Sequence, residues 1–396
     1  MEEAAASPEG WRRLRPVTKE DFIEDQALSP PYGTRLCLPF ADLGLIVESS
    51  GSSGRGRETH YLSRGDVDRL AQLWARHLAR MGIGELDVVA LTFPIGMAGG
   101  GVKHAAAYAA LGAKLIRISN LSAAQKLEAM RYYRATVLVA TPSYVDRLAV
   151  AALEAKLDPR DLGLRRIVVA TQSVSVDWVR QAQERWEARL YEWYGTSAGL
   201  VAFCCEQGMV VGPGRRGTLH WDADSALQEV VDPETGRWAS DGERGELVGT
   251  ALINEAEPYF RYATGDEARF VAPGSCPCGS DRPGIESGTV RRLDQMFKVK
   301  GVNIWPSHIE ASLFAFPAVQ DYRAKLLHDA AHREVAHVEV LAPRGEPGLA
   351  EELAGLLREQ TGIGFSVSLS RDPEGWSQET GGEAAKTRRW LDERTR

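Results

Sequence analysis

The stretch "LRRIVVATQSVSVDWVRQAQERWEARLYEWYGTSAGL", residues 164–200, decides the fold. A short β-branched run comes first, an amphipathic stretch follows, and a second apolar run then ends in aromatic, glycine and hydroxyl residues. This alternation of strand, helix and strand is typical of a parallel sheet wrapped by helices. The turn "YGTSAGL", residues 194–200, therefore follows the carboxyl end of a strand, where open α/β sheets usually bind ligands.

The same alternation extends upstream, where "DVVALTF", "KLIRIS" and "TVLVAT" are separated by the helical stretches "VKHAAAYAALGA" and "AAQKLEAMRYYR". The run "LIVESSG" and the helical stretch "DVDRLAQLWARHLARMG" begin this alternation, and the chain before them reads as irregular. From about Gly212, short strands interrupted by Gly, Pro and Asp indicate β-hairpins. The last hundred or so residues alternate strands and helices in a way that predicts a small α+β domain. We expect a large α/β domain at 1–292 and a small mobile α+β domain at 293–396.

Composition restricts the class of protein. The formal net charge of −7 over 396 residues argues against a nucleic-acid partner. No apolar run reaches membrane-spanning length, and the N-terminus lacks the pattern of a secretory signal. Five cysteines, an odd number, disfavour a secreted disulfide framework. We expect a cytoplasmic enzyme with free thiols and no membrane partner, and we leave a homodimer open.

Three polar segments suggest chemistry. In "SSGSSGRGR", residues 49–57, glycines and hydroxyls could wrap phosphates, although alone the segment equally fits a flexible surface loop. In "RYATGDEARF", residues 261–270, Asp266 could accept hydrogen bonds from a ribose diol or simply cap a turn. The charges of "RRLDQMFKVKGVNIWPSHIE", residues 291–310, could solvate a linker. The three segments in this order are far more specific than any one of them.

Taken together with "TPSY", "GELVGTAL" and "EAAKTRRWLDER", these segments make the chain resemble the adenylate-forming acyl/aryl ligase superfamily, and most closely its phenylacetate–CoA ligase branch. The resemblance covers nearly the whole chain. It implies that a carboxylate attacks the α-phosphorus of ATP, in the presence of Mg²⁺, to give an acyl-adenylate and pyrophosphate. A thiol, that of coenzyme A in this branch, then displaces AMP. Both steps depend mainly on positioning and on charge at phosphorus.

The resemblance also implies roles for individual residues. The β- and γ-phosphates of ATP would be wrapped by Ser49, Ser50, Gly51, Ser52, Ser53, Gly54 and Arg55. The adenine would be lined by Ala170, Thr171 and Gln172, and the base and α-phosphate would be held by Tyr194, Gly195, Thr196 and Ser197. Asp266 would bind the ribose and Arg292 would reach the nucleotide. Asp294 would be the hinge of the small domain, and Lys386 would bridge carboxylate and α-phosphate.

The acyl pocket is predicted in "LTFPIGMAGGGVKH", residues 91–104. The residues expected to form its wall are Phe93, Ile95, Met97, Gly99 and Gly100. A flat aromatic acid suits such a wall, although the apolar members could equally belong to the core.

Cysteine and histidine predict a second kind of site. Cys276 and Cys278 form "CPC", while Cys205 and His220 lie upstream in the same loop-rich region, about residues 200–285. Three thiolates and an imidazole are a tetrahedral Zn²⁺ shell with no open position, which indicates a structural metal. Cys204 is the alternative first ligand, and buried free cysteines are the alternative to a metal.

Three departures from the family qualify the chemistry. Ala198 stands where the family has a glutamate that helps to hold Mg²⁺, Arg55 stands where lysine is usual, and Gln172 stands where glutamate is favoured. Magnesium would then be held by phosphates and water, a nearby acid such as Glu206 would substitute, or adenylation would be weak. We expect a specialised ligase that activates an aryl acid for transfer to coenzyme A. The alternatives are transfer to an amine, a carrier-protein thiol or an intramolecular nucleophile, and a catalytically reduced nucleotide-binding protein.

Overall fold

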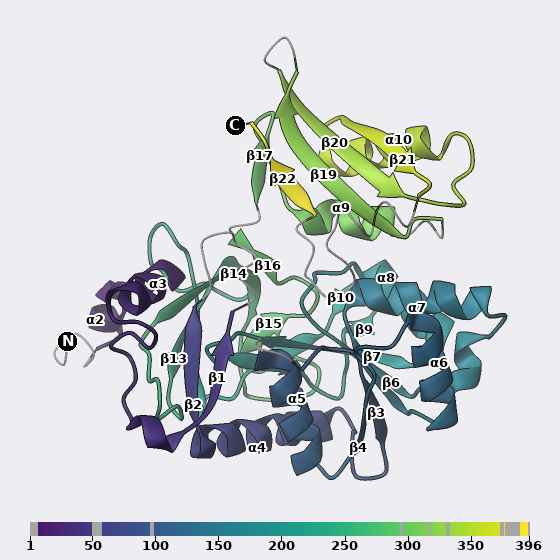
Figure 1. The fold of residues 1–396 in the computed structure, drawn as a ribbon. Helices are drawn as coiled ribbons and strands as arrows, with labels where there is room; N and C mark the ends of the chain where they lie inside the picture. The colour runs from purple at the N-terminus through teal and green to yellow at the C-terminus, as the bar shows by residue number, and fades with distance from the viewer. Residues whose placement is uncertain are drawn as a thin grey trace. The chain divides into compact units, whose positions relative to one another are not determined.

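The computed structural model describes residues 7–49, 58–95, 99–293, 296–314, 316, 318–329, 333–372, 376 and 389–394. The chain divides into two compact units, Met1–Leu293 and Asp294–Arg396. This division falls one residue after the boundary expected at 292. The fold is mixed α/β, with a large mixed sheet in the first unit and a separate small sheet in the second (Figure 1).

The first unit contains the parallel sheet expected from the strand and helix alternation. Its parallel strands are β3 (Val88–Leu91), β4 (Lys114–Arg117), β5 (Val137–Ala140), β6 (Arg166–Val169) and β7 (Arg189–Gly195). They lie in the order β4-β3-β5-β6-β7. All four residues of β5, "VLVA", are buried, as a central strand covered on both faces requires.

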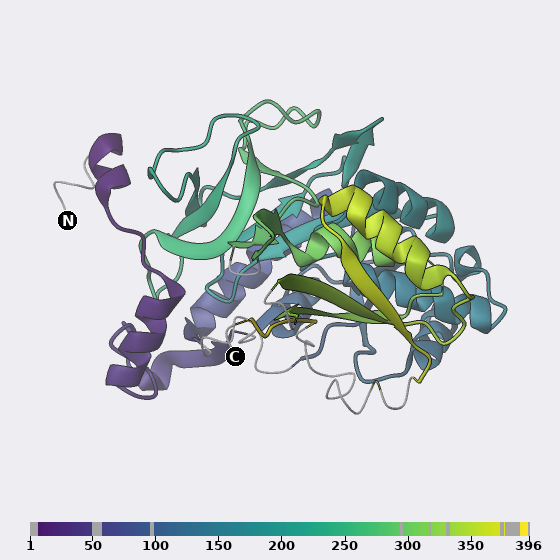
Figure 2. The same cartoon turned by 90° about the horizontal axis from the view of Figure 1, so that it is seen from above.

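Helices connect these strands and cover the sheet. They are α4 (Arg64–Arg80), α5 (Gly99–Ala110), α6 (Ala123–Tyr132), α7 (Pro142–Glu154) and α8 (Val176–Trp186), with the 3₁₀ turn η2 (Pro159–Leu162) before β6. Right-handed connections put α5 on one face of the sheet and α6, α7 and α8 on the other, because the chain reverses direction at the edge strand β4. Figures 1 and 2 show α6, α7 and α8 side by side, whereas α5 lies with α4.

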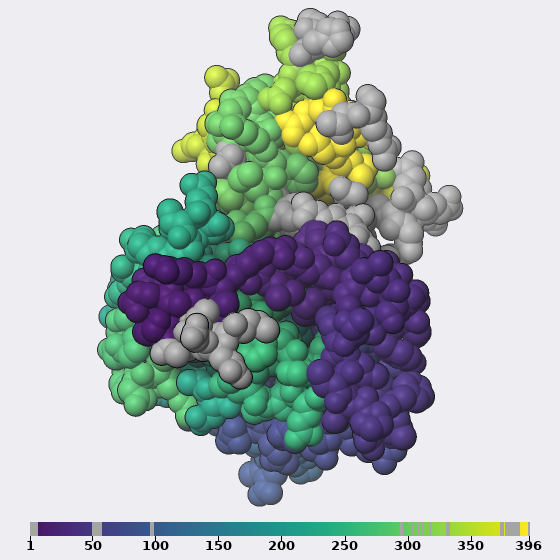
Figure 3. Space-filling model, turned by 90° about the vertical axis from the view of Figure 1, so that its left-hand side faces the viewer, coloured from purple at the N-terminus to yellow at the C-terminus, as the bar shows by residue number. Residues whose placement is uncertain are grey.

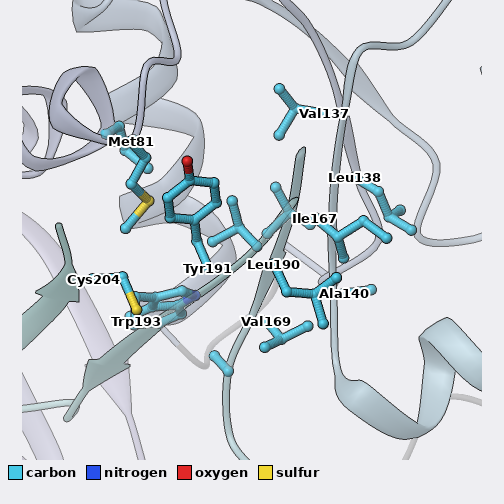
Figure 4. Packing of buried hydrophobic residues seen from close by; sticks show 14 of the residues in the cluster. Met81, Val137, Leu138, Ala140, Ile167, Val169, Leu190, Tyr191, Trp193 and Cys204 are labelled. Atoms are coloured by element: carbon cyan, nitrogen blue, oxygen red, sulfur yellow. The ribbon is translucent and has the colours of Figure 1, made fainter. Parts of the chain in front are cut away.

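The apolar side chains between the layers form one core. Leu138, Ile167, Val169 and Leu190 come from three neighbouring strands and are fully buried. Figure 4 shows them together with Trp193 and Cys204, where β7 passes toward the second half of the sheet. Burial of each such side chain contributes roughly 1.5–3 kcal/mol of transfer free energy. Together these side chains fix the position of β7 relative to its neighbouring strands.

Beyond β7 the sheet becomes antiparallel. Its further strands are β8 (Val201–Cys204), β11 (Thr218–His220), β15 (Gly284–Glu286), β14 (Tyr262–Val271), β13 (Arg244–Ala251) and β12 (Ala226–Val231), in that spatial order, while β16 (Arg291–Arg292) pairs with β14. The short hairpin of β9 (Val210–Gly212) and β10 (Arg215–Arg216) lies apart from them. This half contains the hairpins predicted from the Gly- and Asp-rich sequence.

The region before β1 is not irregular, which corrects the expectation from sequence. It forms α2 (Pro8–Arg13), α3 (Lys19–Leu28) and η1 (Phe40–Asp42). The strand expected at "LIVESSG" is β1 (Leu43–Glu48), which forms a hairpin with β2 (Thr59–Ser63). Thr18 and Asp21 form a reciprocal capping box that starts α3. Figure 3 shows this region, in purple, lying across the antiparallel part of the sheet. Arg261, which is 2 % exposed, holds it there by donating to the carbonyl of Arg12 at 3.0 Å.

The second unit has its own sheet and core. Four strands lie in the order β21 (Phe365–Ser370), β20 (Glu334–Leu341), β19 (Asp321–His328) and β22 (Trp390–Asp392), with a separate hairpin of β17 (Phe297–Val299) and β18 (Val302–Ile304). The helices α9 (Pro306–Leu313) and α10 (Leu349–Thr361) supply apolar residues such as Ile309 and Leu353 to the core. In neither unit do the described residues include a helix that is both long enough and apolar enough to span a bilayer.

Candidate functional site

The carboxyl ends of the parallel strands bring together the segments predicted to bind ligands. The segments that follow β3, β5, β6 and β7 begin at Thr92, Thr141, Ala170 and Thr196. Because the strands are parallel, all four segments leave the sheet on the same side, at the carboxyl ends of the strands, which we call the ligand-binding edge. The turn after β7, residues 196–200, leads back into the antiparallel strand β8 at the same edge.

Asp266 forms the most ordered polar contact near this edge. The Tyr194 hydroxyl donates to its Oδ2 at 2.8 Å, and Arg292 Nη1 lies 3.3 Å from its Oδ1. The pairing of Asp266 with Arg292 in the β14–β16 ladder sets this approach. Burial, and then the charge of Asp266, raise the pKa of Tyr194 well above its usual value, so its hydroxyl remains a neutral donor. Asp266 is 8 % exposed, and its carboxylate lies beside the Arg292 guanidinium.

The segment after β6 is conformationally unusual. Thr171 has φ +76°, a left-handed conformation that is rare for a β-branched residue and is often found at functional sites. Gln172 turns its amide away from this position, since its Oε1 accepts the backbone N–H of Ser143 at 3.0 Å. Ala170 is buried. Of the predicted adenine segment, Thr171 is thus the exposed member, and Gln172 joins it to the loop after β5.

The turn after β7 is closed by its own hydrogen bonds. Thr196 N donates to Leu200 O at 3.0 Å, and Gly199 N donates to Thr196 O at 3.1 Å. Gly195 has to be glycine, because a Cβ there would lie 2.4 Å from the Trp193 ring. Ser197 is half-buried in this turn.

Ala198 does not leave an open gap where a carboxylate would sit. It is 3 % exposed and packs with Phe22, Leu200 and Tyr259. Its carbonyl accepts from Tyr259 Oη at 2.9 Å and from Asn254 Nδ2 at 3.2 Å. A Mg²⁺ held by the side chain of residue 198 therefore does not fit, because alanine offers no ligand oxygen and its methyl group packs among apolar side chains.

Glu206 is not the substitute acid that the sequence suggested. It follows Cys205 at the far end of β8, because Val201 of β8 lies opposite Gly195 while Phe203 lies opposite Trp193. There it lines a cavity together with His220 and Cys278. The acid is thus separated from the turn by the length of the strand.

A buried carboxylate lies instead beside the start of the predicted phosphate loop. Ser49 Oγ accepts the backbone N–H of Glu58 at 3.1 Å and the ammonium of Lys19 at 3.3 Å. The Tyr262 hydroxyl contacts the Glu58 carboxylate at 2.9 Å. Burial acts to raise the pKa of Glu58, but hydrogen bonds from His60 and Tyr262 outweigh it and lower the pKa. The sequence analysis missed this group, because the contact joins Glu58 to a residue 204 positions later in the chain.

The predicted acyl wall is partly polar. Phe93 stacks on His104 with ring centroids 5.8 Å apart, and Ile95 is 41 % exposed. Gly99 is buried and Gly100 has open space around it. Two charged or titratable residues of α5 that the sequence reading did not assign, Lys103 and His104, are also buried. The signal for them was present in "GGGVKHAAAYAA", where they are the only polar side chains apart from the tyrosine hydroxyl.

The structure brings together the four predicted metal ligands. One ligand atom from each of Cys205, His220, Cys276 and Cys278 lies within 4.8 Å of all the others. The sulfurs of Cys205 and Cys276 are 3.8 Å apart, and Cys278 Sγ is 3.4 Å from His220 Nε2. Three thiols and an imidazole at these separations fit a tetrahedral Zn²⁺.

Surrounding contacts favour this assignment of ligands. His220 Nδ1 lies 3.0 Å from the Arg282 carbonyl, which fixes the proton on Nδ1 and leaves the Nε2 lone pair facing the thiols. Cys204 points elsewhere, since its sulfur accepts the backbone N–H of Glu192 at 3.3 Å. Of the two adjacent cysteines, Cys205 is therefore the one in the cluster.

Several predicted residues lie outside the described part of the chain. These are Ser50, Gly51, Ser52, Ser53, Gly54, Arg55, Met97, Asp294 and Lys386.

Comparison with known proteins gives concordant results. A family model described as AMP-binding enzyme matches residues 49–250. The phenylacetate-coenzyme A ligase of Thermus thermophilus is 28% identical over 99% of this chain and 90% of its own length. The enzyme of the same name from Pseudomonas putida is 27% identical over 96% of this chain and 86% of its own length. Among solved structures, a 2-hydroxyisobutyryl-CoA ligase in the postadenylation state has a TM-score of 0.82, with 24% identity over 100% of this chain and 84% of that chain.

Proposed function

The chain belongs to the AMP-binding enzyme family, and from this premise we propose that it activates an aromatic carboxylic acid with ATP and transfers the acyl group to coenzyme A. The observation that best supports this proposal is the buried carboxylate of Asp266, which Tyr194 and Arg292 hold near the ligand-binding edge of the sheet. The resemblance to two phenylacetate-coenzyme A ligases over nearly the full chain supports the acid and thiol substrates.

The reaction balances as two displacements. A substrate carboxylate oxygen bonds to the α-phosphorus of ATP while the bond to pyrophosphate breaks, which gives an acyl-adenylate. The thiolate of coenzyme A then bonds to the acyl carbon, and AMP leaves with the electron pair of the broken C–O bond. Neither displacement requires a covalent bond to the protein, so catalysis rests on positioning and on charge stabilisation.

The roles of this chain's residues follow from their positions in the sheet. Asp266 accepts hydrogen bonds from the ribose hydroxyls, and Arg292 offsets negative charge beside it. Thr171 and the turn through Ser197 border the base and the α-phosphate. For Lys386 and Asp294, which lie outside the described residues, the family resemblance alone supports the roles proposed: Lys386 would bridge the carboxylate and the α-phosphate, and Asp294 would be the hinge of the second unit. We derive no step through a Mg²⁺ held at Ala198, since that residue cannot ligate one.

The test compares two neighbouring carboxylates of β14. Asp266→Ala should lower acid-dependent formation of AMP and pyrophosphate by about 100-fold, because the nucleotide loses its ribose ligand. Glu267→Ala is the matched control, since Glu267 pairs with Arg291 on the opposite face of the same strand. Assays with and without coenzyme A separate thioester formation from transfer to another acceptor. Equal activity of both variants would remove the assignment of Asp266.

We also propose a structural Zn²⁺ bound by Cys205, His220, Cys276 and Cys278. The chemistry of the donors supports it, and a metal with four protein ligands joins hairpins that are distant in sequence. Zinc bound in this way supplies folding free energy and no catalytic water. Elemental analysis of protein purified without added metal should give about one zinc per chain, and a result near zero would refute the site. The five reduced cysteines support a cytoplasmic location.

A further inference from the structure

Lys103 is a buried cation for which the described residues provide no anionic partner. It lies in the second turn of α5, and the residue is 7 % exposed. Its Nζ donates to the carbonyl of Ser197 at 3.0 Å and lies 3.5 Å from that of Thr196. An ammonium has three N–H groups, and these two neutral oxygens are the acceptors that the described residues provide.

The charge of Lys103 is therefore left uncompensated by the part of the chain that the structure describes. Burial alone lowers the pKa of Lys103 to about 8, whereas a nearby carboxylate would oppose this shift. Burying an ammonium without a counter-ion costs several kcal/mol, and such a group is normally paired.

A second buried lysine provides a comparison. Lys126 of α6 is 4 % exposed and donates to the Leu121 carbonyl. Its ammonium also lies 4.9 Å from the centre of the Tyr144 ring, which adds a cation–π contact. Lys103 makes no such contact within the described part of the chain. The difference indicates that Lys103 is placed for a ligand and Lys126 for the fold.

The next residue of α5 also has polar atoms without a partner among the described residues. His104 is fully buried, and neither of its ring nitrogens has a hydrogen-bond partner among the described residues. Its ring is 5.8 Å from Phe93 of the predicted acyl wall and 4.5 Å from Trp193, whose Nε1 is also unpartnered. Buried polar atoms are normally satisfied, so the unsatisfied nitrogens of His104 and Trp193 support a ligand near α5.

We propose that Lys103 is the counter-ion for an oxyanion of the acid substrate, so that the pocket selects acids by a carboxylate held at α5. This inference rests on the proposed ligase function and adds a specificity-determining residue to it. The anion has two sources with the same chemistry. It is either the carboxylate that reacts with ATP or a second carboxylate on the ring of the substrate. The location at the Thr196–Ser197 carbonyls puts the cation within the turn that follows β7.

The test uses the full chain, two acids and matched variants. Phenylacetate carries one carboxylate and 3-carboxyphenylacetate carries two. For each acid, kcat/KM for AMP release and the Kd in titration calorimetry without nucleotide are measured. Lys103→Met and Lys103→Gln should each lower kcat/KM and affinity at least about 30-fold for the acids that Lys103 binds, whereas Lys103→Arg should retain part of both. Lys126→Met, the matched control, should change them less than about threefold.

The outcomes separate the two sources of the anion. A loss confined to 3-carboxyphenylacetate assigns Lys103 to a second carboxylate and makes the substrate a diacid. An equal loss for both acids assigns it to the reacting carboxylate. Unchanged kcat/KM and Kd in both uncharged variants would overturn the proposal, and melting curves check that these variants are folded.

Failure of the ligase function is distinguishable from failure of this inference. If the native chain releases no AMP but binds an acid in a way that Lys103→Met abolishes, the anion site stands and the ligase assignment falls. If AMP is released equally by the native chain and both uncharged variants, the ligase stands and the anion site falls. Acids that are neither bound nor turned over by the native chain would overturn both.

Discussion

The two ends of the β7–β8 strand pair contain different kinds of buried polar groups. At the end that leads into Cys205, three thiols and His220 face one another within 4.8 Å. At the other end, the turn at residues 196–200 contacts Lys103, whose buried charge has no anionic partner among the described residues. In our proposals, a metal would complete the first end and a substrate oxyanion would complete the second. Stability and function would then be separated along one pair of strands.

Removing a metal ligand at the Cys205 end of the strand pair should have the largest effect on stability. Cys276→Ser removes one ligand and leaves the metal shell open, so we expect the free energy of unfolding in urea to fall by at least about 4 kcal/mol. When a chelator has removed the metal from the native protein, the native protein and the variant should have similar free energies of unfolding. Cys37→Ser is the control, because Cys37 is exposed and lies outside the cluster. Similar unfolding midpoints for both variants would contradict a structural metal.

The metal ligands and the parallel strands could be predicted from the sequence, whereas other parts of the fold could not. The Cys and His positions could be assigned because metal ligands of this type are chemically distinctive, yet the choice between Cys204 and Cys205 required the alternation of side chains along β8. The parallel strands were predictable because their β-branched runs are buried on both faces. The helix α3 was not, since its described side chains include one buried residue, Phe22, and so show no apolar periodicity. Its capping box at Thr18 was the available signal.

The role of Lys103 could not be found by spacing. A lysine in a sequence is normally taken to be solvated, and the oxygens that it contacts belong to residues more than ninety positions later. Glu58 and Tyr262 were missed for the same reason, since their contact joins residues 204 positions apart. The hinge Asp294 and Lys386 remain predictions from the family resemblance, because both lie outside the described residues.

Ala198→Glu, in the turn at residues 196–200, should lower the free energy of unfolding by an intermediate amount. The new carboxylate would lie among Phe22, Leu200 and Tyr259 at a position that is 3 % exposed, so we expect a loss of about 2–4 kcal/mol of unfolding free energy. Activity should not increase, because the turn is packed around alanine. Ala223→Glu provides the exposed control and should change stability by less than about 0.5 kcal/mol. A stable, more active Ala198→Glu variant would show that the turn can still receive a metal-binding acid.

The smallest effect should have the opposite sign. In the absence of substrate, Lys103→Met should raise the free energy of unfolding by roughly 1–3 kcal/mol near pH 7, because it removes a buried charge without a counter-ion. The folded pKa of Lys103 is about 8, below the ordinary value of 10.5, so the unfolded chain binds more protons between these values. The stability of the native protein should therefore rise as pH increases through this window, and the advantage of the variant should shrink from pH 8 toward pH 10.5. Lys126→Met, which loses a cation–π contact, should not stabilise the protein at any pH. A Lys103→Met variant that is less stable than the native chain at pH 7 would mean that the ammonium is already paired in the free protein, and the contrast between the two strand ends would no longer hold.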